Sequence, residues 1–109
     1  MEEWVRVADL SELPPGSAMR VIGPADKPIA LFNVDGSLHA INDVCPHRGG
    51  PLSRGALRGS VVICPWHGWT FDVRTGQPDH PGGHSVATYR VKVVGTTIYV
   101  GWLRGGGGA

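Results

Sequence analysis

Charged residues are scarce in this sequence. Asp, Glu, Lys and Arg make up 17% of the 109 residues, against about 25% in an average soluble protein. The basic residues number 10 and the acidic residues 9, so the formal net charge is only +1. A chain with so little excess charge of either sign is not expected to bind nucleic acid or an anionic membrane surface.

Long hydrophobic segments and a leader sequence are also missing. No apolar run approaches the roughly 20 residues that span a bilayer. The N-terminal sequence MEEWVRVADL lacks the basic and apolar regions of a signal peptide, and we therefore expect a cytoplasmic protein. The chain has only 2 cysteines, and in a reducing compartment such a pair is more often a set of metal ligands or free thiols than a disulfide.

A helical period of apolar residues is the third absence. Short β-type runs recur instead, separated by Gly, Pro and Asp-Gly turn signals. We predict strands at residues 4–8, 18–22, 29–34, 38–42, 61–64, 69–72, 87–93 and 97–102. The pattern indicates an all-β fold with a single domain over residues 1–104. The glycine-rich tail, residues 105–109, offers nothing to pack and is predicted to be disordered.

Each cysteine is followed closely by a histidine. The first loop reads Cys45-Pro-His47, and the second reads Cys64-Pro-Trp-His67. Two thiolates and two imidazoles can form a zinc site, but zinc fingers place a pair of cysteines together and a pair of histidines together. Here each loop supplies one residue of each kind. This mixture fits better a 2Fe-2S cluster in which two cysteines bind one iron and two histidines bind the other, with zinc or no metal as the alternative.

The double motif resembles that of the Rieske 2Fe-2S family, with Cys-x-His and Cys-x-x-His set in CPHRGGPL and CPWHGWTFD. The resemblance covers the whole chain, because isolated Rieske domains have about this length. It implies a Rieske-type antiparallel β-sandwich with a small cluster-binding subdomain, formed by the two Cys/His loops at about residues 44–72. It also implies one 2Fe-2S cluster, with Cys45 and Cys64 on one iron and His47 and His67 on the other.

The residues around the motif are similar to those of the low-potential members of this family. In the high-potential members each loop carries an extra cysteine, and these two positions align with Gly50 and Trp66 here, so no disulfide can join the loops. The serine and tyrosine hydroxyls that donate to sulfur in those members align with Trp69 and Phe71. Without such donors the reduced, more negative cluster is less stabilised. We therefore predict a midpoint potential at the low end of the Rieske range, roughly −150 to +300 mV.

These features resemble those of the Rieske-type ferredoxins of bacterial oxygenase systems. The resemblance implies a one-electron carrier, not an enzyme by itself, that passes electrons from an NAD(P)H-dependent flavoprotein reductase to a terminal oxygenase. A monomer that forms transient complexes is expected. The first alternative is the small subunit of an NAD(P)H-dependent nitrite reductase, which has the same fold, and the second is a structural zinc module.

Partner docking is expected at the tip of the domain, where the family exposes the edges of its histidine ligands. We predict a docking rim made of Arg48, Leu52, Trp66 and Pro81. In such a rim the apolar side chains would exclude water and Arg48 would aid orientation.

Overall fold

The computed structural model describes residues 4–45, 50–66, 68–79 and 84–103, and this part of the chain is built almost entirely from β-strands. The strands are β1 (Val5–Asp9), β2 (Ala18–Ile22), β3 (Pro28–Val34), β4 (Ser37–Asn42), β5 (Ala56–Arg58), β6 (Val61–Ile63), β7 (Thr70–Asp72), β8 (Thr88–Val94) and β9 (Thr97–Leu103). Three short 3-10 helices, η1 (Leu10–Glu12), η2 (Pro24–Asp26) and η3 (Leu52–Arg54), lie between them. Every pair of neighbouring strands is antiparallel, which confirms the predicted all-β fold.

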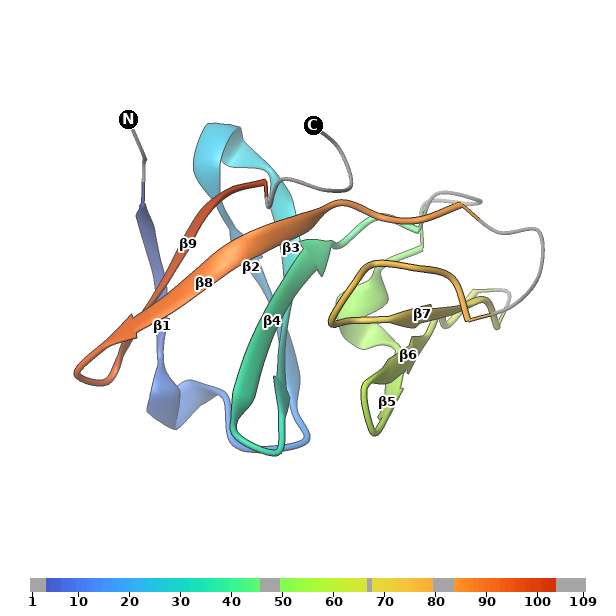
Figure 1. Ribbon diagram of the computed structural model, residues 1–109, viewed down its shortest axis with the longest axis horizontal. Helices are drawn as coiled ribbons and strands as arrows, with labels where there is room; N and C mark the ends of the chain where they lie inside the picture. Colours follow the sequence, from blue (N-terminus) through green and yellow to red (C-terminus); the bar gives the residue numbers. More distant parts are fainter. Residues whose placement is uncertain (1–3, 46–49, 67, 80–83, 104–109) are drawn as a thin grey trace.

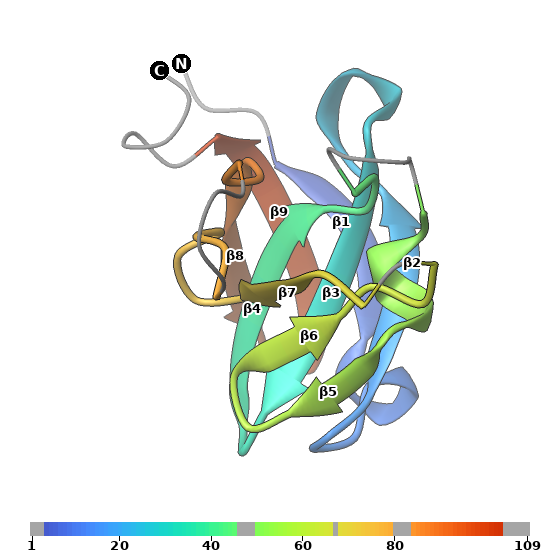
Figure 2. The ribbon, with the colours of Figure 1, turned by 90° about the vertical axis from the view of Figure 1, so that its right-hand side faces the viewer.

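The strands form one large and one small sheet. The large sheet has six strands in the order β1-β9-β8-β4-β3-β2, and the small sheet has three in the order β5-β6-β7. The small sheet lies beside one end of the large sheet (Figure 1). Viewed from that end, it stands in front of β3 and β4 (Figure 2).

Strand β3 is apolar along its length because both of its faces are covered. Ile29 and Leu31 belong to a core enclosed by the large sheet, whereas Ala30 and Phe32 belong to a second core shared with the small sheet. All four side chains are fully buried. Since successive side chains of a strand point to opposite faces, this one strand separates the two cores and supports the small sheet from behind.

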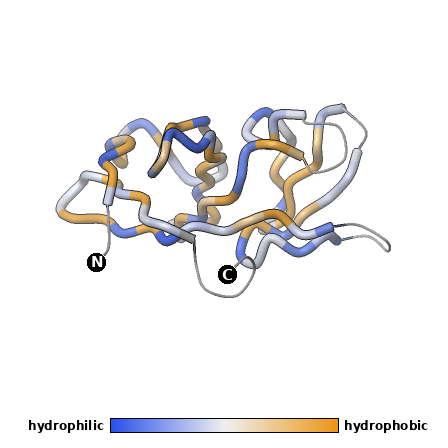
Figure 3. The backbone as a smooth tube through the Cα atoms, turned by 90° about the horizontal axis from the view of Figure 1, so that it is seen from above, coloured by the Kyte–Doolittle hydropathy of each residue, from blue (hydrophilic) through white to orange (hydrophobic). Residues whose placement is uncertain are grey.

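No helix in the described part of the chain is long and apolar enough to cross a membrane. Seen from above, hydrophobic and hydrophilic stretches follow one another at short intervals along the chain (Figure 3). This is the pattern of strands that bury one face and expose the other.

Eight of the nine strands lie where the sequence predicts them, within one residue at each end. The exception is β5, which has only 3 residues and no clear apolar alternation. It follows Gly55, where an added Cβ would collide with the carbonyl oxygen of Ile63 on the neighbouring strand β6. The close approach of these two strands therefore depends on a glycine whose partner is distant in sequence.

Candidate metal centre

The first Cys/His loop follows β4 and is closed at its base. Val44 forms an isolated antiparallel bridge with Pro51. One step further in, the amide of Cys45 donates to the carbonyl oxygen of Gly50 at 2.9 Å. These contacts fix both ends of the loop, and residues 46–49 between them lie outside the described residues.

A buried carboxylate anchors the base of this loop. Asp43 is only 3% exposed, and its Oδ1 atom accepts a hydrogen bond from the amide of Ser53 at 2.7 Å. Its main-chain carbonyl accepts a second bond, from the amide of Leu52, at 2.7 Å. Its Oδ2 atom lies 3.4 Å from Nε of Arg20 on β2. A buried charge is tolerated when it is paired and hydrogen-bonded in this way. Asp43, two positions before Cys45, thereby joins β2 and η3 to the base of the first loop.

The sequence around Asp43 contains no motif that marks it as a functional residue. A single aspartate after a strand carries no signal of its own, since most aspartates lie in solvent. Only the fold shows that its carboxylate is buried against an amide ten positions away.

The second Cys/His loop connects β6 to β7. The amide of Cys64 donates to the carbonyl oxygen of Trp69 at 2.7 Å, and the amide of Gly68 donates back to the carbonyl oxygen of Cys64 at 3.0 Å. Gly68 has a φ of 75°, in the left-handed region that glycine adopts without steric cost. The chain therefore turns back tightly, with Cys64 held at the end of β6.

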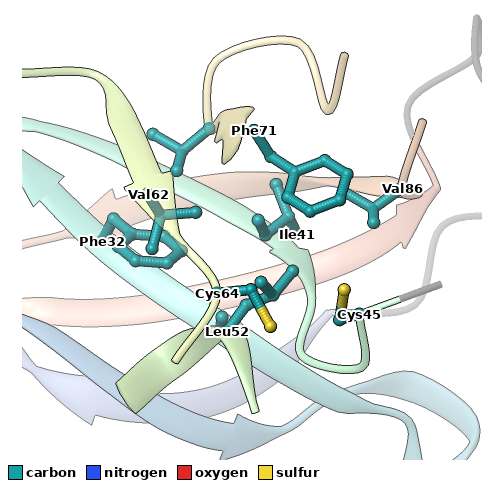
Figure 4. Packing of buried hydrophobic residues seen from close by; sticks show 10 residues of the cluster. Phe32, Ile41, Cys45, Leu52, Val62, Cys64, Phe71 and Val86 are labelled. Atoms are coloured by element: carbon teal, nitrogen blue, oxygen red, sulfur yellow. The ribbon is translucent and has the colours of Figure 1, made fainter. Parts of the chain in front are cut away.

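Both cysteine side chains are buried in the core between the two sheets. Cys45 is 2% exposed and Cys64 is 1% exposed, and both pack in the same cluster as Leu52 and Phe71 (Figure 4). Both thiols are free of disulfide bonds. A Cβ built on Gly50 would lie 3.0 Å from Sγ of Cys64, so the first loop reaches the sulfur of the second.

This arrangement fits one half of a 2Fe-2S site. Two thiols, the soft ligands that iron–sulfur clusters require, come from two closed loops in contact and are shielded from water. His47 and His67 lie outside the described residues, so their part in the site stays a prediction. Within the described ranges, no group of three or more His, Cys, Asp or Glu side chains is placed to hold a metal ion.

The predicted docking rim is only partly supported. Leu52 is fully buried, because η3 turns it into the core beside the cysteines, so the prediction that it contacts partners is wrong. Trp66 is 58% exposed and stays a candidate, while Arg48 and Pro81 lie outside the described residues. Val44, which is not among the predicted rim residues, is 41% exposed next to Cys45.

The two residues that align with hydroxyl donors take up packing positions. Phe71 is fully buried in the core that contains both cysteines. Trp69 is half-buried and packs against the same core. Neither side chain carries a hydroxyl group, so neither can donate an O–H hydrogen bond to a sulfur atom.

Comparison with known proteins identifies the family. A family model of the Rieske [2Fe-2S] domain matches residues 3–100. The chain belongs to the Rieske [2Fe-2S] family. It is similar to the biphenyl dioxygenase ferredoxin subunit of Pseudomonas sp. (strain KKS102), with 36% identity over 103 residues that cover 93% of this chain and 94% of the relative.

Solved structures agree with the Rieske assignment. One, described as a complex of reduced oxygenase and oxidised ferredoxin in carbazole 1,9a-dioxygenase, contains a chain with a TM-score of 0.82 and 35% identity, over 89% of this chain and 91% of that one. Another, described as an NADH-dependent nitrite reductase small subunit from Mycobacterium tuberculosis, has a TM-score of 0.83 and 29% identity, over 95% of this chain and 98% of that one.

Membership of the Rieske family confirms the prediction of one 2Fe-2S cluster and removes the support for a zinc module. The similarity to the biphenyl dioxygenase ferredoxin subunit confirms the prediction that this chain is an electron carrier rather than an enzyme by itself.

Proposed function

We propose that this Rieske protein takes one electron from an NAD(P)H-dependent flavoprotein reductase and delivers it to a terminal oxygenase. The observation that carries the proposal is the pair of buried thiols, Cys45 and Cys64, supplied by two closed loops in contact. A 2Fe-2S cluster supplies one-electron redox chemistry when it is bound. The chain acts as a monomer whose complexes with the two partners are transient.

Four residues would hold the cluster. Cys45 and Cys64 would bind one iron, and His47 and His67 would bind the other. The burial of both thiols keeps water from their sulfur atoms. The backbone bonds that close each loop hold the thiols in place without a disulfide.

Partners would dock over the two cysteine loops. Val44 and Trp66 are exposed apolar side chains that lie within two residues of a cysteine in sequence, one on each loop. Such side chains exclude water from an electron-transfer contact. Arg48 and Pro81 are proposed to complete the rim, and the former would help to orient an acidic partner.

A stopped-flow experiment tests this function. The dithionite-reduced protein is mixed with the oxidised oxygenase component of carbazole 1,9a-dioxygenase, and reoxidation is followed by visible absorbance. We expect transfer within seconds that accelerates with oxygenase concentration, and a slower transfer for Val44→Ser. A protein that carries a reducible cluster but fails to transfer would contradict the oxygenase role.

The nitrite reductase role is favoured by one observation, the 0.83 TM-score to a protein described as a small subunit of that enzyme. Under this alternative the protein would form a stable complex with the large subunit of an NADH-dependent nitrite reductase. Size-exclusion chromatography of the mixed proteins separates the two functions, because a transient carrier elutes alone and a subunit elutes with its partner.

A further inference from the structure

Gly50 is buried beneath the indole ring of Trp66. A Cβ built on Gly50 would lie 2.9 Å from Cγ of that ring, a distance that requires something to shift, and 3.1 Å from Cδ2, which is a tight contact. The indole ring therefore leaves no room for a larger side chain at this position.

The same point of space adjoins a cysteine sulfur. The Cβ built on Gly50 would also lie 3.0 Å from Sγ of Cys64. Gly50 closes the first loop through its bond with Cys45, whereas Trp66 belongs to the second loop. The indole ring therefore crosses from one loop to the other directly beside a sulfur atom.

Exposure shows which side of the contact faces water. Trp66 is 58% exposed, whereas Cys64 is 1% exposed, and Gly50 is buried. The ring thus covers the junction of the loops from the solvent side. A large aromatic ring excludes water from such a junction at little cost in conformational entropy.

We propose that Trp66 is a positioning residue that holds the two cysteine loops together and shields the Cys64 sulfur from water. Gly50 is its required partner. This inference rests on the proposed function in one respect, that Cys45 and Cys64 are the thiolate ligands. Water that reaches the sulfur atoms stabilises the reduced, more negative state, because hydrogen bonds and solvent exposure set the potential of an iron–sulfur centre.

The large sheet contains a matched control for this contact. Trp4 covers Gly101 of β9, where an added Cβ would lie 3.0 Å from Cζ3 of the ring. Gly101 belongs to β9 and Trp4 directly precedes β1, and these two neighbouring strands lie away from the small sheet (Figure 1). Substitutions there remove the same kind of contact without touching the cysteine loops.

The experiment compares cluster-loaded variants at the two sites. Trp66→Ala and Gly50→Ala are set beside Trp4→Ala and Gly101→Ala, with Trp66→Phe as the conservative variant. Two quantities are measured: the midpoint potential, and the rate of iron loss to a ferrous chelator followed by visible absorbance. Circular dichroism of each metal-free variant establishes that it folds.

We expect Trp66→Ala to raise the midpoint potential and to accelerate iron loss about tenfold. A change of this size lies within the range of interaction free energies typical of residues in contact. Gly50→Ala should have the same effects, and the double variant should exceed the larger single effect only slightly. Trp66→Phe should restore most of both properties, whereas the variants at the control site should match the wild type. A folded Trp66→Ala protein that retains no iron would also support the inference.

Two results would overturn this inference in distinguishable ways. If Trp66→Ala carries a cluster with the same midpoint and iron-loss rate as Trp4→Ala, the positioning role fails and the proposed function stands. If the wild-type protein binds no cluster, the proposed function and the inference fail together.

Discussion

The Nε atom of Arg20 on β2 lies 3.4 Å from Oδ2 of Asp43, two residues before Cys45. The two side chains differ in exposure, 60% for Arg20 and 4% for Asp43. The arginine therefore keeps most of its contact with water, whereas the carboxylate depends on its protein partners. The bond from the Ser53 amide is the contact that the buried carboxylate cannot replace with water.

Substitution of Asp43 separates the hydrogen bond from the ion pair. We expect Asp43→Ala to lower the free energy of unfolding by about 1–3 kcal/mol, because the amide of Ser53 is left without an acceptor. Arg20→Gln should cost less than Asp43→Ala, because the arginine is 60% exposed and water screens its interaction with the carboxylate. Asp43→Asn, which keeps an acceptor, should fall between them. Urea denaturation of the metal-free protein measures all three, and an Arg20→Gln variant as unstable as Asp43→Ala would contradict this ranking.

Leu52 is expected to act through packing rather than through docking. Its side chain is fully buried beside the cysteines, so Leu52→Ala should lower the free energy of unfolding by about 2–5 kcal/mol. The rate of electron transfer to a partner, measured on molecules that retain the cluster, should change little. A stable Leu52→Ala protein with a weakened partner complex would restore Leu52 to the docking rim.

The burial of the Leu52 side chain could not be predicted from the sequence alone. The proximity of Leu52 to the Cys/His motif in sequence favours a surface position. However, η3 begins at this residue and turns its side chain inward. Likewise, β5 depends on the fit of Gly55 against Ile63. Both features are set by residues that meet only in the fold.

Features set by residues that are contiguous in sequence, in contrast, could be predicted. The apolar run of β3 and the Asp35-Gly36 turn after it are contiguous in sequence, and the turn has the positive φ values that a tight hairpin needs. The spacing of cysteine and histidine in each loop is equally local. The family and its cofactor could therefore be predicted, whereas the partners of Gly50 and Asp43 could not.

An ion pair on the small sheet should affect acid stability. Nη2 of Arg74 donates to Oδ2 of Asp72 at 2.8 Å, and Nε donates to Oδ1 at 3.1 Å. These bonds hold the pKa of Asp72 below its ordinary value. Because the folded pKa is the lower one, the ionised carboxylate stabilises the fold above the unfolded value of about 4. This stabilisation is lost as the pH falls through the folded pKa.

Asp72→Asn should therefore lower stability by less than about 1 kcal/mol at neutral pH, since the Arg74 side chain is 60% exposed and water screens the pair. Its stability should approach that of the wild type as the pH falls below the unfolded value and through the lower folded pKa, because the wild-type carboxylate then loses its charge. Urea denaturation across this pH range, with Arg74→Gln as the partner variant, provides the measurement. A difference from the wild type that is constant with pH would show that the ion pair is not its source.

Two glycines with similar backbone angles should respond differently to substitution. Gly76 has a φ of 76° and Gly16 a φ of 85°, but an added Cβ collides with the carbonyl of Val86 only at the former and meets open space at the latter. Gly16→Ala should cost about 1–2 kcal/mol for the backbone strain alone. Gly76→Ala should cost clearly more, because the clash also breaks the 2.8 Å bond from the Val86 amide to the Gly76 carbonyl. Equal losses in thermal denaturation would show that the clash is relieved by a small shift.

The electron paramagnetic resonance spectrum of the dithionite-reduced protein, titrated against potential, tests the central claim most directly. We predict a rhombic signal with an average g below that of an all-cysteine 2Fe-2S ferredoxin, as expected for His47 and His67 on one iron. Its midpoint should fall below about +100 mV, in the lower part of the Rieske range. A protein that gives no signal and contains zinc, or one with a midpoint above that value, would contradict the account.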